Sequence, residues 1–222
     1  MNKAAIERFA SSARSQLMED VEQRLHELGL SREAIKSGAI LDVGRVTLDG
    51  KLLDPEKVNE WHALVDVLSD IGHERVVEQV AYTWFNRFVA LRFMEVNGYL
   101  PGGVRVLSAA GADPSDFRAR PDIMRHATSA LPVDEHLVRE MRMAGDDEGL
   151  YRYLLQVQCT ELAATFPFLF EEIEDWIELL FPRSILAEGS IIRRLVAEIP
   201  EDDWRGQVEI VGWLYQYYIS ER

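Results

Sequence analysis

The segment from residue 81 to residue 101, AYTWFNRFVALRFMEVNGYLP, constrains the fold more than any other part of the chain. A surface helix of a globular protein keeps one apolar stripe and leaves its opposite face polar. Here apolar residues cover nearly the whole circumference of a helix predicted over about 73–97: Val80, Ala81, Trp84, Phe85, Phe88, Val89, Leu91, Phe93, Met94 and Val96. Such a helix must be buried on most sides, so we expect it to form the centre of a helical domain.

The same helix carries polar residues that need partners, because burying an unpaired charge is costly. Arg92 and Glu95 stand at i, i+3 and can form an ion pair along the helix. Arg87 lies five positions before Arg92, which places it roughly 140° away around a helix with 3.6 residues per turn. The two arginines therefore serve different faces. We expect each to bind a carboxylate or a backbone carbonyl, and not to form a joint phosphate clamp.

Helical periodicity continues through most of the chain. Apolar residues at three- and four-residue steps predict a long helix over 6–28 that ends at Gly29. Residues 38–54 break this period, and the Asp49-Gly50 pair favours a turn, so a small β-hairpin near 39–53 is expected. The chain is therefore predicted to be mainly α, a bundle-like domain of several helices around the buried central helix.

One stretch, 98–121, is rich in Gly, Ala, Asp and Pro and has little helical pattern. Within it, Val104–Leu107 is predicted as a short strand. We take 98–121 as a sub-boundary inside one helical module that spans residues 1–222.

Three phrases of the sequence are specific enough to indicate a family. They are the block Val77–Leu107 with the 81–101 segment, the closing QVEIVGWLYQYYISER from Gln207 to Arg222, and the opening MNKAAIERFASSAR. Together they resemble the N-terminal region of the PglX family, the adenine-specific DNA methyltransferases of BREX phage-defence systems. The resemblance implies a whole protein that uses S-adenosylmethionine to methylate adenine in double-stranded DNA. It also implies a downstream methyltransferase domain and other BREX components as partners.

The catalytic motifs of that family are absent from this sequence. The chain contains no Gly-x-Gly, as a loop for S-adenosylmethionine would need, and no Pro-Pro pair, as an Asn-Pro-Pro-aromatic motif would need. We therefore expect the methyltransferase core after residue 222, and no catalytic, cofactor-binding or metal-binding residue within the segment. Its predicted role is to scaffold the core and to contribute to recognition.

The charge balance argues against a broad DNA-binding surface. The formal net charge is −14 at pH 7, whereas affinity for DNA comes mainly from cations that neutralise phosphates. FRARPDIMR is the one locally basic stretch with loop character. If the segment contacts a DNA backbone, we expect the contact at Arg118, Arg120 and Arg125.

The last helix, predicted over about 208–219, is apolar on several sides. We expect it to pack against a following domain through Trp213, Tyr217 and Tyr218. Stacked aromatic rings can also receive flipped bases, but packing is the commoner role of such residues.

Other chemical features have simple structural explanations. The five histidines are not in metal-ligand spacing, and Cys159 has apolar neighbours typical of a core residue. Acidic residues at 171–178 fit the solvated face of an amphipathic helix, and no lysine follows Lys57 to complete a nuclease site. Arg193 and Arg194 are predicted on the polar face of the helix over 191–199.

The N-terminus lacks the apolar core of a signal peptide, and no apolar run approaches the length that crosses a bilayer. With a single cysteine, these features indicate a cytoplasmic protein without membrane contact. Two other classes remain open. One is a docking module of a defence complex that does not touch DNA, and the other is an independent helical enzyme.

Overall fold

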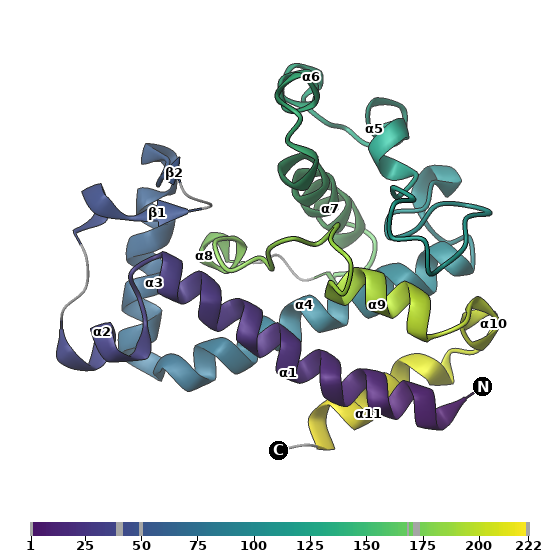
Figure 1. Cartoon of the computed structure of the whole chain (residues 1–222), viewed down its shortest axis with the longest axis horizontal. Helices are drawn as coiled ribbons and strands as arrows, with labels where there is room; N and C mark the ends of the chain where they lie inside the picture. The colour runs from purple at the N-terminus through teal and green to yellow at the C-terminus, as the bar shows by residue number, and fades with distance from the viewer. Residues whose placement is uncertain (1, 39–41, 49–50, 168, 171–173, 221–222) are drawn as a thin grey trace. The chain divides into compact units, whose positions relative to one another are not determined.

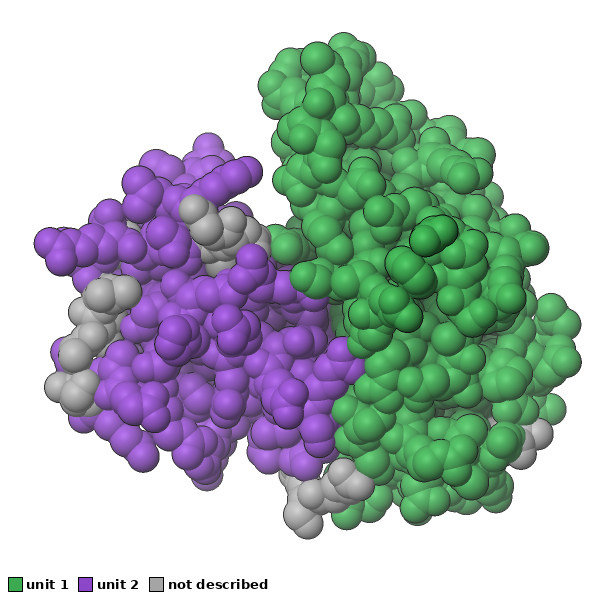
Figure 2. Space-filling view, viewed as in Figure 1, with its two compact units in different colours: residues 1–13, 86–172, 184–222 green, residues 14–85, 173–183 purple. Residues whose placement is uncertain are grey.

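A computed structural model describes residues 2–38, 42–48, 51–167, 169–170 and 174–220. Figure 1 shows a chain built almost entirely of helices, as the sequence predicts. Its contacts divide it into two compact units, coloured in Figure 2: unit 1 comprises 1–13, 86–172 and 184–222, and unit 2 comprises 14–85 and 173–183.

The first two boundaries between the units along the chain, after residues 13 and 85, fall inside long helices. Helix α1 (Lys3–Glu27) contributes its first turns to unit 1 and the rest to unit 2, and α4 (His73–Val96) is divided after Phe85. The irregular stretch 98–121 lies within unit 1 and is not a boundary between the units. That the whole chain acts as one module stays a prediction.

The predicted central helix is confirmed as α4. Eleven of its apolar side chains are buried: Val76, Val77, Val80, Ala81, Trp84, Phe85, Phe88, Val89, Ala90, Leu91 and Met94. The charged residues Arg87, Arg92 and Glu95 are buried with them. A helix with this pattern lacks a solvated face over most of its length, which is why the sequence identifies it so clearly.

Unit 2 also contains α2 (Arg32–Ser37), α3 (Val58–Ile71) and α8 (Asp175–Glu178), with 3-10 turns at Val43–Arg45 and Pro55–Lys57. Ser31 caps α2 by accepting a hydrogen bond from the Ala34 amide at 3.2 Å.

The predicted hairpin is confirmed by an antiparallel pair of two-residue strands, β1 (Thr47–Leu48) and β2 (Lys51–Leu52). In its register, Thr47 lies opposite Leu52 and Leu48 opposite Lys51. The Asp49-Gly50 turn itself lies outside the described residues.

Two side chains fasten distant segments within unit 2. Buried Trp61 of α3 donates its ring N–H to the carbonyl of Leu28 at 3.1 Å. Arg24 of α1, which is fully buried, donates its Nε to the carbonyl of Phe181 at 2.8 Å. The Phe181 ring then packs edge-on against Trp84. These contacts hold the segment around Phe181 in the unit.

Helix α8 is shorter than the amphipathic helix predicted over the acidic stretch. Glu174 is not helical, and its carboxylate accepts a hydrogen bond from the ring N–H of Trp176. Trp176 and Ile177, which belong to the short helix, are buried. The predicted Glu171 and Glu172 positions lie outside the described residues.

Unit 1 contains α5 (Ile123–Ala130), α6 (Glu135–Ala144), α7 (Asp147–Ala163), α9 (Ile191–Glu198), α10 (Glu201–Trp204) and α11 (Glu209–Ser220), with a 3-10 turn at Pro101–Gly103. Helices α5 and α6 both pack against α7. Cys159 of α7 is buried, as predicted.

A buried carboxylate organises the centre of unit 1. Oε1 of Glu95 accepts hydrogen bonds from Arg92 at 2.6 Å and from Ser108 at 3.0 Å. Oε2 accepts the backbone N–H groups of Val106 at 2.9 Å and Leu107 at 2.8 Å. The predicted Arg92–Glu95 pair is confirmed, but it also fixes a segment outside the helix.

The strand predicted over Val104–Leu107 is absent. The N–H groups that a strand would pair with a neighbouring strand are bonded to the Glu95 carboxylate instead. On the other side, the Tyr151 hydroxyl donates to the Val106 carbonyl at 2.8 Å. Side chains therefore bind these backbone groups where a short strand was predicted.

The network extends to α10. Glu201 accepts hydrogen bonds from Arg105 and from Arg205 at 3.3 Å, and lies 3.5 Å from the Arg92 guanidinium. These three arginines, Arg105 foremost, lower the pKa of the Glu201 carboxyl. Alternating charges thus connect α4, the segment after it and α10.

We expect Glu95→Gln to lower the free energy of unfolding by about 3–5 kcal/mol, because it removes the charge that compensates a fully buried guanidinium. Urea denaturation measures the change. Glu140→Gln, at an exposed position on α6, serves as the control and should change stability by less than about 0.5 kcal/mol. Equal stabilities of the two variants would contradict this account of the core.

Candidate functional site

The predicted DNA-contacting residues lie within residues 113–125, which we name the arginine segment; it consists of consecutive turns that lead into the first turn of α5. The Asp113 carboxylate accepts hydrogen bonds from the amide and hydroxyl of Ser115 at 2.9 and 2.8 Å. The Asp116 carboxylate accepts the Arg118 amide at 3.0 Å. Asp side chains stabilise turns in this way, so the local sequence explains why the backbone bends here.

The three predicted arginines differ in exposure. Arg118 is exposed, and its guanidinium lies 5.7 Å from the ring centroid of Phe117. Arg120 is half-buried and forms a 3.4 Å ion pair with Asp147 at the start of α7. Arg125 is exposed on α5. All three belong to unit 1.

The sequence did not indicate that Arg193 supports this segment. The prediction placed Arg193 on a polar face, which is wrong, because its side chain is buried with 8% of its surface exposed. Its Nη1 donates to the Ala119 carbonyl at 2.8 Å, between Arg118 and Arg120. Arg194 does lie on a more open face and pairs with Glu198 at 2.7 Å. The sequence around Arg193 and Arg194 does not predict which of them is buried. Arg193 is buried because a segment distant in sequence, around Ala119, packs over it.

The aromatic residues of α11 lie on two adjoining faces. Tyr218 is buried on the side that packs within unit 1, together with Ile210 and Leu214. Trp213 and Tyr217 are half-buried and stack with ring centroids 5.8 Å apart. The Lys3 ammonium of α1 lies 4.0 Å from the Trp213 ring, a cation–π contact. The start of α1 therefore already covers part of this face.

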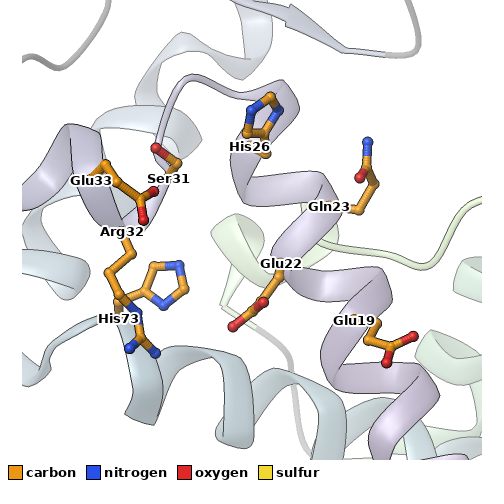
Figure 3. Close-up of a pocket in the computed structure, with 8 residues that line it drawn as sticks. All are labelled: Glu19, Glu22, Gln23, His26, Ser31, Arg32, Glu33 and His73. Carbon is orange, nitrogen blue, oxygen red and sulfur yellow. The ribbon is translucent and has the colours of Figure 1, made fainter.

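Unit 2 contains an open pocket of about 620 Å³. Polar and charged residues of α1, α2 and the start of α4 line it: Glu19, Glu22, Gln23, His26, Ser31, Arg32, Glu33 and His73. Figure 3 shows the Glu22 carboxylate reaching toward the His73 ring, with Glu33 and Arg32 near it. Gln23 and His26 point away from His73.

Carboxylates outnumber cations around His73. Burial lowers the pKa of the imidazole, and Glu22, Glu33 and Glu74 only partly offset that effect. Arg32 is engaged with Glu74 at 3.0 Å. The pocket therefore offers acceptor atoms and negative charge to a cationic group. Among the described residues, no cluster of three or more His, Cys, Asp or Glu side chains is arranged to hold a metal ion.

Within the described part of the chain, no helix combines the length and apolarity that a membrane crossing needs.

The chain was compared with known proteins. No family model matches it. It is 39% identical over 227 residues to the adenine-specific methyltransferase BrxX of Escherichia coli O9:H4 (strain HS), and the match covers all of this chain and 19% of BrxX. It is 35% identical over 255 residues to the adenine-specific methyltransferase PglX of Lacticaseibacillus casei (strain Zhang), covering all of this chain and 20% of PglX.

The chain is homologous to the N-terminal segment of PglX-type adenine-specific methyltransferases. The family resemblance predicted from the sequence is therefore confirmed. The chain spans about a fifth of the length of these curated relatives. The matched region covers both structural units.

The carboxylate of Asp20 on α1 provides a test of how the negative charge of this helix affects stability. Burial, and secondarily the neighbouring Glu19, raise the pKa of Asp20 from 3.8 to about 6, against the opposing effect of Arg24. The folded state thus holds this proton more tightly than the unfolded chain. The free energy of unfolding therefore falls as pH rises from about 4 to about 6.

We expect Asp20→Asn to stabilise the protein by about 1 kcal/mol at neutral pH, a small gain because solvent screens this partly exposed carboxylate. The gain should disappear near pH 4, where Asp20 is protonated in the folded state. Thermal unfolding across this pH range measures it. Asp66→Asn, at an exposed site on α3, is the control. A gain independent of pH would refute the assignment to Asp20.

Proposed function

We propose that this chain is the N-terminal helical scaffold and recognition segment of a BREX adenine-specific DNA methyltransferase. The match of the entire chain to a fifth of BrxX, at 39% identity, carries this proposal. The whole protein would transfer a methyl group from S-adenosylmethionine to adenine in double-stranded DNA and so mark self DNA in phage defence. It would act in the cytoplasm.

The segment by itself should not catalyse methylation. Its sequence has neither a Gly-x-Gly loop nor a Pro-Pro pair. Binding of S-adenosylmethionine and of the target adenine would therefore be functions of a following methyltransferase core. S-adenosylmethionine would bind to that core. The helical units would then hold the core and contribute contacts to DNA or to other BREX components.

Contact with DNA is proposed at the arginine segment. Arg118 and Arg125 are exposed cations on turns and on a short helix, which suits neutralisation of backbone phosphates. The exposed Phe117 ring beside Arg118 adds an apolar surface. The neighbouring Asp113 and Asp116 limit the strength of such a contact, so we expect it to add to binding by the core and not to replace it.

A substitution of Arg118, Arg120 and Arg125 together by Gln should weaken binding to duplex DNA and lower the slope of log affinity against log salt by up to about 3. Fluorescence anisotropy with labelled duplex DNA, at low and at physiological salt, measures both quantities. The matched control substitutes Arg8, Arg75 and Arg139, three exposed arginines elsewhere, by Gln.

Equal losses in the two triple variants would assign the effect to overall charge and refute a specific contact. No binding by the unmodified chain even at low salt would favour the second candidate function, a docking module for another defence component. The net charge of −14 and the carboxylate-lined pocket favour this alternative. A partner that uses it should carry a basic surface.

The half-buried face of α11 is proposed to pack against the methyltransferase core. Trp213→Ala should lower the melting temperature more in a protein that includes the core than in the 222-residue chain, because the core would bury the Trp213–Tyr217 pair further. Met143→Ala, at a side chain 83% exposed on α6, is the control. Identical shifts in the two lengths of protein would exclude this interface.

A further inference from the structure

Arg193 is buried in a way that its own surroundings do not explain. Its side chain is nine-tenths buried, yet it lies on a helix whose other buried residues, Ile191, Ile192, Leu195 and Val196, are apolar. Burying a guanidinium costs several kcal/mol unless carboxylates or several acceptors compensate it. Attraction to the carboxylates of Asp116 and Glu148 offsets only part of this cost, since burial still lowers the pKa of the Arg193 guanidinium, and no ion pair with Arg193 occurs among the described residues.

Its hydrogen bonding is equally incomplete. Nη1 donates to the Ala119 carbonyl at 2.8 Å. The Nε and Nη2 groups have no partner within the described part of the chain. A buried cation with one hydrogen-bond acceptor, and with carboxylates that attract it only at longer range, contributes little to the free energy of unfolding.

The position of the acceptor, the Ala119 carbonyl, indicates what Arg193 does. Ala119 lies between Arg118 and Arg120 on the arginine segment. Described hydrogen bonds inside 113–119 are otherwise local turns, such as the Ala119 amide to the Asp116 carbonyl at 3.1 Å. Among the described contacts, residues 113–120 are tied to other helices by the Arg193 bond to α9 and the ion pair of Arg120 with Asp147 on α7, whereas the end of the segment is also held by a bond from Arg142 of α6 to the Met124 carbonyl at 2.7 Å.

The backbone of Arg193 is held by hydrogen bonds at the start of α9. Arg193 belongs to the first turn of α9, where Ser190 caps the helix by accepting the Arg193 amide at 3.3 Å. The Ser190 hydroxyl donates in turn to the Ile185 carbonyl at 2.8 Å. A rigid helix start thus holds a guanidinium under a turn-rich segment that has few other supports.

We propose that Arg193 is a positioning residue that fixes the backbone of the arginine segment so that Arg118 and Arg120 are presented for contact with DNA phosphates. This inference rests on the proposed function. Arg193 does not itself touch DNA, because it lies buried beneath Ala119. It acts by binding the Ala119 carbonyl. The free-energy cost of burying the guanidinium is accepted because the bond fixes the geometry of the segment.

The test compares Arg193→Met, Arg193→Lys and the control Arg139→Met, which removes one exposed cation from α6. Limited trypsin digestion followed by mass spectrometry reports on the segment directly, because cleavage after Arg118 requires its backbone to leave the turn. Arg193→Met should accelerate that cleavage several-fold while the melting temperature stays within a few degrees. Arg193→Lys, which keeps a cationic donor, should restore much of the protection.

DNA binding supplies the second readout. Arg193→Met should weaken binding to duplex DNA by about three- to tenfold, more than Arg139→Met, although each removes one charge. Unchanged cleavage after Arg118 in Arg193→Met would overturn the proposal, as would faster cleavage with an affinity equal to that of the control.

The two proposals fail in different ways. If substitution of Arg118, Arg120 and Arg125 has no effect on DNA binding, the proposed contact is wrong and Arg193 has no role in it. The digestion then decides whether Arg193 fixes the segment at all. If the triple substitution weakens binding but Arg193→Met does not, the contact stands and the positioning role alone is refuted.

Discussion

The carboxylate of Glu95 is the interaction on which unit 1 depends. A buried negative charge must be matched by donors, and here Arg92, Ser108 and the amides of Val106 and Leu107 supply them. Three of these donors, Val106, Leu107 and Ser108, belong to the irregular segment after α4. The charge therefore defines the path of the chain after α4. From that path follow the place of the arginine segment and the approach of α10 through Glu201.

The sequence predicts features whose causes are local. Apolar residues around a full helical circumference predict α4, and the i, i+3 spacing predicts the Arg92–Glu95 pair; both are confirmed. Predictions failed where a distant group decides. Val104–Leu107 has the composition of a strand, but a carboxylate on another element takes its N–H groups. Arg193 has the sequence context of a surface residue, and it is buried because the segment around Ala119 packs over it.

The candidate DNA contact illustrates how a strongly acidic chain can meet a polyanion. Screening at physiological salt limits electrostatic effects to about 8 Å, so the local arrangement of charge matters more than the net value. Arg118 and Arg125 project from unit 1, whereas the carboxylates of Asp113 and Asp116 are engaged in holding turns. The acidic pocket of unit 2 is a separate chemical environment, suited to cations.

The bond from Arg24 to the Phe181 carbonyl has a consequence for synthesis. It joins residues 157 positions apart, and unit 2 includes the segment that carries Phe181, so the unit cannot be completed until that segment has been made. At about 5–20 residues per second, the nascent chain waits on the order of ten seconds or more. During that interval Arg24 and Trp84 lack the partner that Phe181 provides in the folded unit. Completion of the unit is thus a late, long-range event in the life of the polypeptide.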